Sequence, residues 1–239
     1  MAIAGEVNQA IGRAYQFAFI AALEGNIKHF ESKFIVEREP EKTSFIGRSG
    51  TSFSFDFNGV YSHPWRSCEV FGECKGYSKA YDLLHEFRLF LARSYVASSD
   101  NVRHRRDMFW FITNVSFGCS EGADIRSFDF VMRTLAETSN GEVREIVGNG
   151  NIDEAFVRSL VPNIGVFILT DSYLMNANLS YKVEAGETLW AILKKFHAGK
   201  APSDFRTKAD QIAVSNGLPS PDKVRSGKRL SLPWYGLGS

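Results

Sequence analysis

Residues 53–79, FSFDFNGVYSHPWRSCEVFGECKGYSK, carry charged side chains where a buried strand would have none. The first part predicts a strand over Ser52–Phe57, in which three phenylalanines share one face and Asp56 lies among them. The second part predicts another strand, which ends with Glu73 and Lys75 two residues apart. Because residues i and i+2 of a strand project to the same face, Glu73 and Lys75 stand side by side. If the two strands pair as neighbours, Asp56 joins them.

Two carboxylates and a lysine at one sheet edge suit a hard divalent cation and an activated water. Mg²⁺ binds through one or two carboxylates, keeps several waters and commonly lies beside phosphate. The stretch therefore predicts a site for Mg²⁺ (or Mn²⁺) at Asp56 and Glu73, to which the backbone carbonyl of Cys74 adds a ligand. Lys75 would orient or help to activate the attacking water. The alternative is that Glu73 and Lys75 form an ion pair on a solvated strand.

Asp56 followed by Glu73-Cys74-Lys75 resembles the motif of the PD-(D/E)xK nuclease superfamily, whose fold is restriction-endonuclease-like. The expected order of elements is similar to the core of that family: a helix over 2–24, strands, a helix over 78–97 and an apolar strand over 108–115. The resemblance covers residues 1–175. It departs from the family pattern in one respect, since no proline precedes Asp56.

The resemblance implies an α/β domain over residues 1–178, with a mixed central sheet flanked by helices. It implies a hydrolase that cleaves phosphodiester bonds, of DNA rather than RNA, with Asp56, Glu73 and Lys75 as catalytic residues. Such enzymes commonly act as homodimers in phage defence or DNA processing. In several members an acidic residue of the first helix joins the metal site, and Glu24 is the candidate here, with a surface residue at the helix end as the alternative.

Basic residues that follow the motif are candidates for contact with the nucleic-acid backbone. Lys79 lies at the start of the helix after the motif, and a run directly before the apolar strand contains Arg103, Arg105 and Arg106. A charged surface loop is the other interpretation of that run. The chain has 28 basic and 27 acidic residues. Ten basic and five acidic residues lie from Ser180 onward, which leaves 18 basic and 22 acidic residues in the rest of the chain. Because the chain before Ser180 is slightly acidic, it does not bind polyanions in general, and contact with DNA requires a local basic patch.

Composition indicates an ordinary globular protein, with 44% hydrophobic residues in 239. Three cysteines make no disulfide framework and no CxxC metal pair, which favours a reducing compartment, the cytoplasm. The apolar run over 14–23 is too short to span a bilayer, and no other segment could cross one.

The last part of the chain, residues 179–239, predicts a separate βααβ unit. The expected elements are a strand over 180–183, helices over 187–196 and about 208–215, and a strand over 229–232. Its ordered motifs, YKVEAGETLW at 181–190, Asn216, and VRSGKRLSLP at 224–233, resemble the LysM domain closely. The segment over 197–207 is several residues longer than is usual in that family.

The LysM resemblance implies binding of glycans that contain N-acetylglucosamine, such as peptidoglycan or chitin, or docking to a protein partner. The groove in such domains lies between two loops. The positions that match these loops are Gly186, Glu187, Thr188, Asn216, Gly217 and Leu218.

Two functions therefore follow from the sequence. The first is a metal-dependent nuclease with a LysM module. The second is a non-catalytic adaptor with a degenerate nuclease fold, whose LysM module docks to a cell-wall or phage-tail-like assembly. Convergence of Asp56, Glu73 and Lys75 favours the first.

Overall fold

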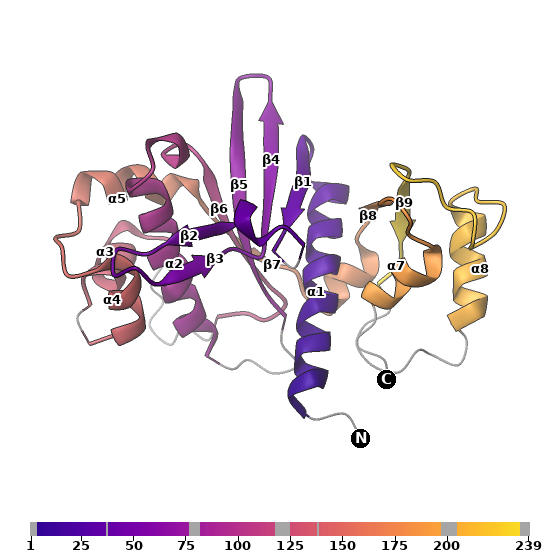
Figure 1. Ribbon diagram of the computed structural model, residues 1–239, viewed down its shortest axis with the longest axis horizontal. Coiled ribbons are helices and arrows are strands. Elements are labelled where there is room, and N and C mark those ends of the chain that lie inside the picture. Colours follow the sequence, from indigo (N-terminus) through magenta and orange to yellow (C-terminus); the bar gives the residue numbers. More distant parts are fainter. Residues whose placement is uncertain are drawn as a thin grey trace.

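The centre of the protein is a five-stranded mixed sheet (Figure 1). Its strands are β1 (Phe30–Ile35), β4 (Phe57–His63), β5 (Arg66–Lys75), β6 (Met108–Thr113) and β7 (Ile164–Ile168), and they lie side by side in that order. The first three pair antiparallel, whereas β5, β6 and β7 pair parallel. This computed structural model describes residues 4–36, 38–76, 82–117, 125–137, 139–196 and 205–234.

β6 is buried on both faces. Phe109 and Phe111 belong to one hydrophobic core, and Trp110 and Ile112 belong to another. Alternate side chains of a strand point to opposite faces, so a continuous apolar run is what a strand between two layers needs. The strand predicted over 108–115 is confirmed as β6.

Helix α1 (Ala4–Asn26) covers one face of the sheet, which confirms the first predicted helix. The helix continues through Gly25 and Asn26, the expected stop. A Cβ atom at Gly25 would lie 1.8 Å from the carbonyl oxygen of Asn178, so the close approach of the C-terminal segment requires glycine there. In the part of the chain that the structure describes, no helix combines the length and hydrophobicity needed to cross a membrane.

Four helices pack on the opposite face: α2 (Leu83–Ser99), α3 (Phe128–Ala136), α4 (Gly141–Val147) and α5 (Glu154–Leu160). Helix α4 was not predicted, because glycines at 141, 148 and 150 indicate loops. The side chain of Asn140 caps this helix by accepting the N–H of Val143 at 3.2 Å, and Gly148 ends it with a φ of 72°. Short 3-10 helices join these elements: η1 (Pro40–Lys42), η2 (Val102–His104) and η3 (Val161–Asn163).

The prediction of one strand over Ser52–Phe57 is wrong. β3 (Ser52–Ser54) pairs with β2 (Ser44–Ile46) in a separate two-stranded sheet, and the chain enters the main sheet only at β4. Phe55 lies in the core under α2, whereas Phe57 lies in the core under α1. Two residues that are i and i+2 of one strand would share a face, so the chain must break between them, and it does so at Asp56.

The C-terminal unit has the predicted βααβ order. It consists of β8 (Leu179–Lys182), α7 (Leu189–Lys195), α8 (Phe205–Ser215) and β9 (Arg229–Leu232), and α6 (Asp171–Asn176) precedes it. Thr188 starts α7 by accepting the N–H of Ala191 at 3.2 Å. β8 and β9 pair antiparallel.

One hydrophobic core extends from the sheet through α1 into the C-terminal unit. It contains Phe57 of the sheet, Phe19 of α1 and Leu230 of β9 in one cluster. In Figure 1 the helices α2–α5, the sheet, α1 and the C-terminal unit follow one another along the long axis. Helix α1 is therefore an inner layer, covered on both sides.

Candidate functional site

Glu73 and Lys75 lie at the carboxyl end of β5, on the face that α2 covers. Phe71, two residues before Glu73, lies in the core under α2, so the strand alternation directs Glu73 and Lys75 the same way. The side chain of Glu73 is only 4% exposed, and that of Lys75 is 21% exposed. The alternative of a solvated strand is therefore wrong, although the ion pair itself is present.

The two side chains belong to a network of four charges. Nζ of Lys75 lies 2.9 Å from Oε1 of Glu73 and 2.9 Å from Oε2 of Glu86. Nη1 of Arg93 lies 3.0 Å from the same Glu73 oxygen. Sequence reasoning missed Glu86 and Arg93. Both lie on α2 seven residues apart, which is about two helical turns and places them on one face.

The pKa of Lys75 is raised above its ordinary value. Burial lowers the pKa of this ammonium, but the carboxylates of Glu73 and Glu86 raise it by more. Lys75 therefore keeps its proton at neutral pH. It can donate hydrogen bonds and carry positive charge.

Asp56 lies beside the same end of β5. Its Oδ2 accepts the backbone N–H of Cys74 at 2.6 Å, and its own N–H donates to the carbonyl of Gly72 at 2.9 Å. Its carbonyl accepts from Nε2 of Gln16 on α1 at 3.2 Å. The carboxylate of Asp56 thus reaches the backbone between Glu73 and Lys75. The structure brings the three predicted residues to one end of one strand.

Glu73 has one carboxylate oxygen without a hydrogen bond. Oε2 is buried and finds no donor among the described residues. A buried polar atom without a partner is costly, so it indicates a missing ligand or stored strain. A buried carboxylate oxygen without a donor is the kind of ligand that a hard divalent cation takes, and Asp56 offers a second carboxylate beside the same end of β5, so the residues present fit Mg²⁺ or Mn²⁺.

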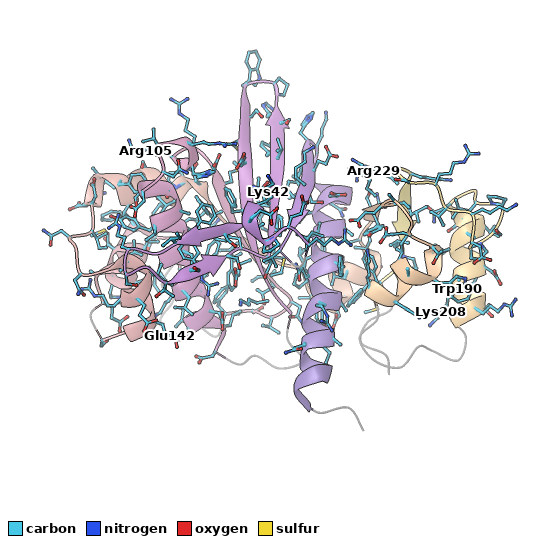
Figure 2. All side chains as sticks on the ribbon, viewed as in Figure 1. Lys42, Arg105, Glu142, Trp190, Lys208 and Arg229 are labelled. Carbon is cyan, nitrogen blue, oxygen red and sulfur yellow. The ribbon has the colours of Figure 1, made fainter. Side chains whose placement is uncertain are left out.

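The basic run lies elsewhere. Arg103, Arg105 and Arg106 are exposed and precede β6, whose first residue pairs with Val70 near the start of β5. Figure 2 shows Arg105 at the outer edge of the molecule. Glu73 and Lys75 lie at the other end of these two parallel strands, so the structure does not bring the run to the charge network. Lys79 lies outside the described residues.

Glu24 does not join Asp56 and Glu73. Its Oε1 accepts the N–H of Ser32 at 2.9 Å, and its Oε2 pairs with Arg229 of β9 at 2.6 Å. Its side chain is 4% exposed, so it is not a surface residue either. Glu24 binds the C-terminal unit to α1.

The predicted glycan-binding residues shape two adjacent loops. The N–H of Leu189, after the first loop, donates to the carbonyl of Pro221, after the second, at 3.3 Å. The carboxylate of Glu187 accepts from the hydroxyl of Tyr181 at 2.9 Å and pairs with Lys195. Thr188 is the cap of α7, described above. These side chains are therefore engaged within the protein.

The second loop is held to β9 by Asn216. Its Oδ1 accepts the N–H of Ser231 at 2.7 Å, and its Nδ2 donates to the carbonyl of the same residue at 2.9 Å. Gly186 and Gly217 have φ values of 81° and 61°, which favour glycine. Leu218 is 9% exposed and lines a pocket of about 550 Å³ next to Gly217.

The order of motifs and the βααβ arrangement can now be compared with known families. The family model described as the LysM domain matches residues 181–233. Residues 181–233 are a LysM domain. The LysM domain contains β8, α7, α8 and β9, and the paired loops at its surface are those that the sequence resemblance indicated.

The remaining comparisons add little about the body of the chain. No curated protein matches the sequence. A solved structure described as the Acinetobacter baumannii Cap4 SAVED/CARF-domain containing receptor with the cyclic trinucleotide 2'3'3'-cAAA is similar, with 15% identity and a TM-score of 0.35. That match covers 70% of this chain and 34% of the receptor chain, so this protein spans about a third of the receptor's length. The TM-score is too low for an assignment of fold or function.

Proposed function

We propose that residues 1–178 form a metal-dependent nuclease that cleaves phosphodiester bonds of DNA. The observation that carries this proposal is the buried Glu73, with one oxygen that has no partner among the described residues, next to a protonated Lys75 and beside Asp56. The order helix, antiparallel meander, helix, parallel strand also agrees with the resemblance to the PD-(D/E)xK family.

Asp56 and Glu73 would hold the cation through their carboxylates. The N–H of Cys74 points toward Asp56, and in an antiparallel pair the N–H and C=O of one residue point the same way. The Cys74 carbonyl is therefore directed toward the same place and would serve as a third ligand. Bound there, Mg²⁺ supplies positive charge to the phosphate and a more acidic water.

The protein's own groups position the reactants. Lys75 would donate to a phosphate oxygen or hold the attacking water, since the neighbouring carboxylates favour its protonated form. Arg93 and Glu86 act through Glu73 and Lys75, because each pairs with one of them at about 3 Å. Their part is to fix the orientation of the two side chains before substrate binds.

The test is cleavage of supercoiled plasmid and single-stranded DNA in Mg²⁺, in Mn²⁺ and in chelator. Glu73→Gln, Lys75→Met and Asp56→Asn should each lower the cleavage rate by about 100-fold or more. The matched control is Lys33→Met. Glu31 and Lys33 repeat the Glu-x-Lys spacing on β1 with Nζ and Oε2 2.9 Å apart, but their side chains are 37% and 40% exposed. That variant should cut at the wild-type rate.

Inert wild-type protein, or equal cleavage by the Lys75→Met variant, would refute the nuclease and favour the adaptor. Gel filtration of the same samples tests the expected homodimer. Cleavage of RNA in preference to DNA would show that RNA, not DNA, is the substrate.

A second function is supported by the family match. We infer that the LysM domain binds glycans that contain N-acetylglucosamine, through the pocket beside Gly217 and Leu218. The side chains of Glu187, Thr188 and Asn216 are engaged within the protein, so the backbone groups of the two loops would make most contacts.

Calorimetric titration with chitin oligomers and with peptidoglycan fragments tests this function. Gly217→Ala places a side chain at a φ of 61° in the second loop and should weaken binding. Gly50→Ala imposes a similar strain at a φ of 89° in the turn between β2 and β3, outside the LysM domain. It is the control and should bind normally. Failure of the wild type to bind either glycan would leave docking to a protein as the function of the domain.

A further inference from the structure

A second group of possible metal ligands lies around Glu69, four residues before Glu73 on β5. Glu69 is on β5, His104 ends η2, and Asp107 directly precedes β6. The side chains of His104 and Asp107 are 11% and 8% exposed, and that of Glu69 is 31% exposed. Three segments therefore bring one imidazole and two carboxylates to a largely buried place.

The spacing of the donor atoms suits one ion. One donor atom from each of the three residues lies within 4.8 Å of the other two. Nδ1 of His104 is 2.7 Å from Oδ2 of Asp107 and 3.8 Å from Oε2 of Glu69. The second distance is too long for a hydrogen bond. Two ligands of a tetrahedral zinc ion lie about 3.3 Å apart, given bonds of about 2.0 Å, so small rotations close the site.

Neighbouring groups hold these ligands in place. Oδ1 of Asp107 accepts the N–H of Glu69 at 3.0 Å, which fixes the carboxylate between the two strands. The imidazole of His104 packs edge-on against Phe45 and Phe71, with ring centroids 5.5 and 5.2 Å apart. An apolar wall and a hydrogen-bonded carboxylate are the surroundings that orient metal ligands in proteins.

The charges leave a place for a cation. Glu69 and Asp107 carry two negative charges. Arg103 contacts the other Glu69 oxygen, Oε1, at 3.1 Å, and its side chain is 77% exposed. An arginine so exposed is strongly screened by water and neutralises little of a buried pair. A divalent ion would neutralise both carboxylates.

We propose that Glu69, His104 and Asp107 bind a divalent transition metal, Zn²⁺ or Mn²⁺, separate from the cation at Asp56 and Glu73. An imidazole nitrogen with two carboxylate oxygens favours these ions over Mg²⁺, which prefers oxygen ligands alone. The ion ties η2 to β5 and to the start of β6.

The experiment is calorimetric titration of chelator-stripped full-length protein with Zn²⁺, Mn²⁺ and Mg²⁺ in a reducing buffer. Co²⁺ added in place of Zn²⁺ serves as a spectroscopic probe of coordination. Wild type should bind one equivalent of Zn²⁺ at this site, in addition to any Mg²⁺ or Mn²⁺ held at Asp56 and Glu73, and His104→Gln and Asp107→Asn should weaken this binding by about 10-fold or more. Circular dichroism verifies that the variants are folded.

Two controls separate this site from other histidines and from the proposed nuclease site. His85→Gln alters another histidine–carboxylate pair, in which Nε2 of His85 lies 3.1 Å from Oε2 of Glu142. Glu73→Gln alters the proposed nuclease site. Both control variants should still bind the equivalent of Zn²⁺ that wild type binds. The proposal is overturned if wild type binds neither Zn²⁺ nor Mn²⁺, if His104→Gln binds as tightly as wild type, or if only Glu73→Gln loses the ion.

Discussion

Glu73 is a buried carboxylate whose charge is balanced by two cations from different parts of the chain. Lys75 comes from the same strand and Arg93 from α2, and both contact Oε1. Transfer of such a charge out of water is expensive, so removal of one partner leaves an uncompensated charge in the interior. Both counter-charges are therefore needed to hold Glu73 in the interior.

Arg93→Leu should lower the free energy of unfolding by about 3 kcal/mol, because Glu73 then keeps only Lys75 as a counter-charge. Urea denaturation at pH 7 measures the loss. Arg103→Leu is the control. The side chain of Arg103, which pairs with Glu69, is 77% exposed, so this variant should lower the free energy of unfolding by under about 1 kcal/mol. Similar losses of unfolding free energy in the two variants would contradict the stronger stabilisation expected from the buried ion pair of Glu73 and Arg93.

At the scale of elements, β4 and β5 fit together through one glycine. Gly72 pairs with Phe57 across the two strands. A Cβ atom at Gly72 would lie 2.0 Å from the ring of Phe57, which is fully buried. The ring thus fills the space that a side chain would take on the α1 face of the sheet, the face opposite to Glu73. This packing determines how Asp56, next to Phe57, approaches β5.

Gly72→Ala should reduce stability by about 1 to 3 kcal/mol, since the ring of Phe57 must move within a close-packed core. Gly12→Ala is the matched control. Gly12 lies within α1 with nothing near its Cβ position, so alanine there should stabilise the helix by up to about 1 kcal/mol. Urea midpoints compare the two. A neutral Gly72→Ala would mean that the ring moves freely.

At the scale of the whole molecule, the LysM domain is packed against the body of the chain rather than tethered to it. Trp234 lies 5.3 Å from the ring of Tyr15, and its Nε1 donates to Oδ1 of Asp171 at 3.1 Å. The hydroxyl of Tyr15 donates to the same carboxylate at 2.9 Å. A Cβ atom at Gly76, next to Lys75, would lie 2.2 Å from Tyr15. The LysM domain therefore contacts a side chain that packs against the end of the candidate site.

The shared core predicts that both parts unfold in one transition, with equal calorimetric and van't Hoff enthalpies. Trp234→Ala should lower the free energy of unfolding by about 3 to 5 kcal/mol and keep a single transition. Trp65→Ala is the control, because Trp65 is 90% exposed at the tip of the β4–β5 hairpin. Two separate transitions in wild type would show that the LysM domain folds independently.

Contacts across the same interface predict a dependence on acid. Hydrogen bonds from Lys33 and from Lys182 of the LysM domain lower the pKa of Glu31 to about 2. Because the pKa of Glu31 is lower in the folded state, its ionised carboxylate stabilises the folded protein at pH values above about 4.5, the pKa in the unfolded chain. This stabilisation is lost as the pH falls from 4.5 toward 2. The side chain is 37% exposed, so water screens the effect to about 1 kcal/mol or less.

Glu31→Gln should therefore be less stable than wild type at pH 6, and the difference should shrink toward pH 2.5. Urea denaturation across this range provides the measurement. A difference that stays constant with pH would indicate lost packing rather than lost charge.

The sequence by itself determined the elements whose signals are local. The periodic apolar pattern of α1, the apolar run of β6 and the ordered motifs of residues 181–233 are each contained in one short segment. The alternation of a strand likewise determined that Glu73 and Lys75 share a face. Helix α4 was missed because glycines lie at both of its ends, although its Asn140 cap is local. The break at Asp56 was missed because a change of sheet depends on partner strands elsewhere in the chain.

Only the tertiary structure decided which of two Glu-x-Lys pairs is buried. Glu31 and Lys33 have the same spacing as Glu73 and Lys75, and both pairs lie on strands. Helix α2 covers the second pair and supplies Arg93 and Glu86, whereas the first pair stays partly in water. Spacing sets the direction of a side chain. Its burial and its counter-charges come from segments far along the chain, which local sequence does not encode.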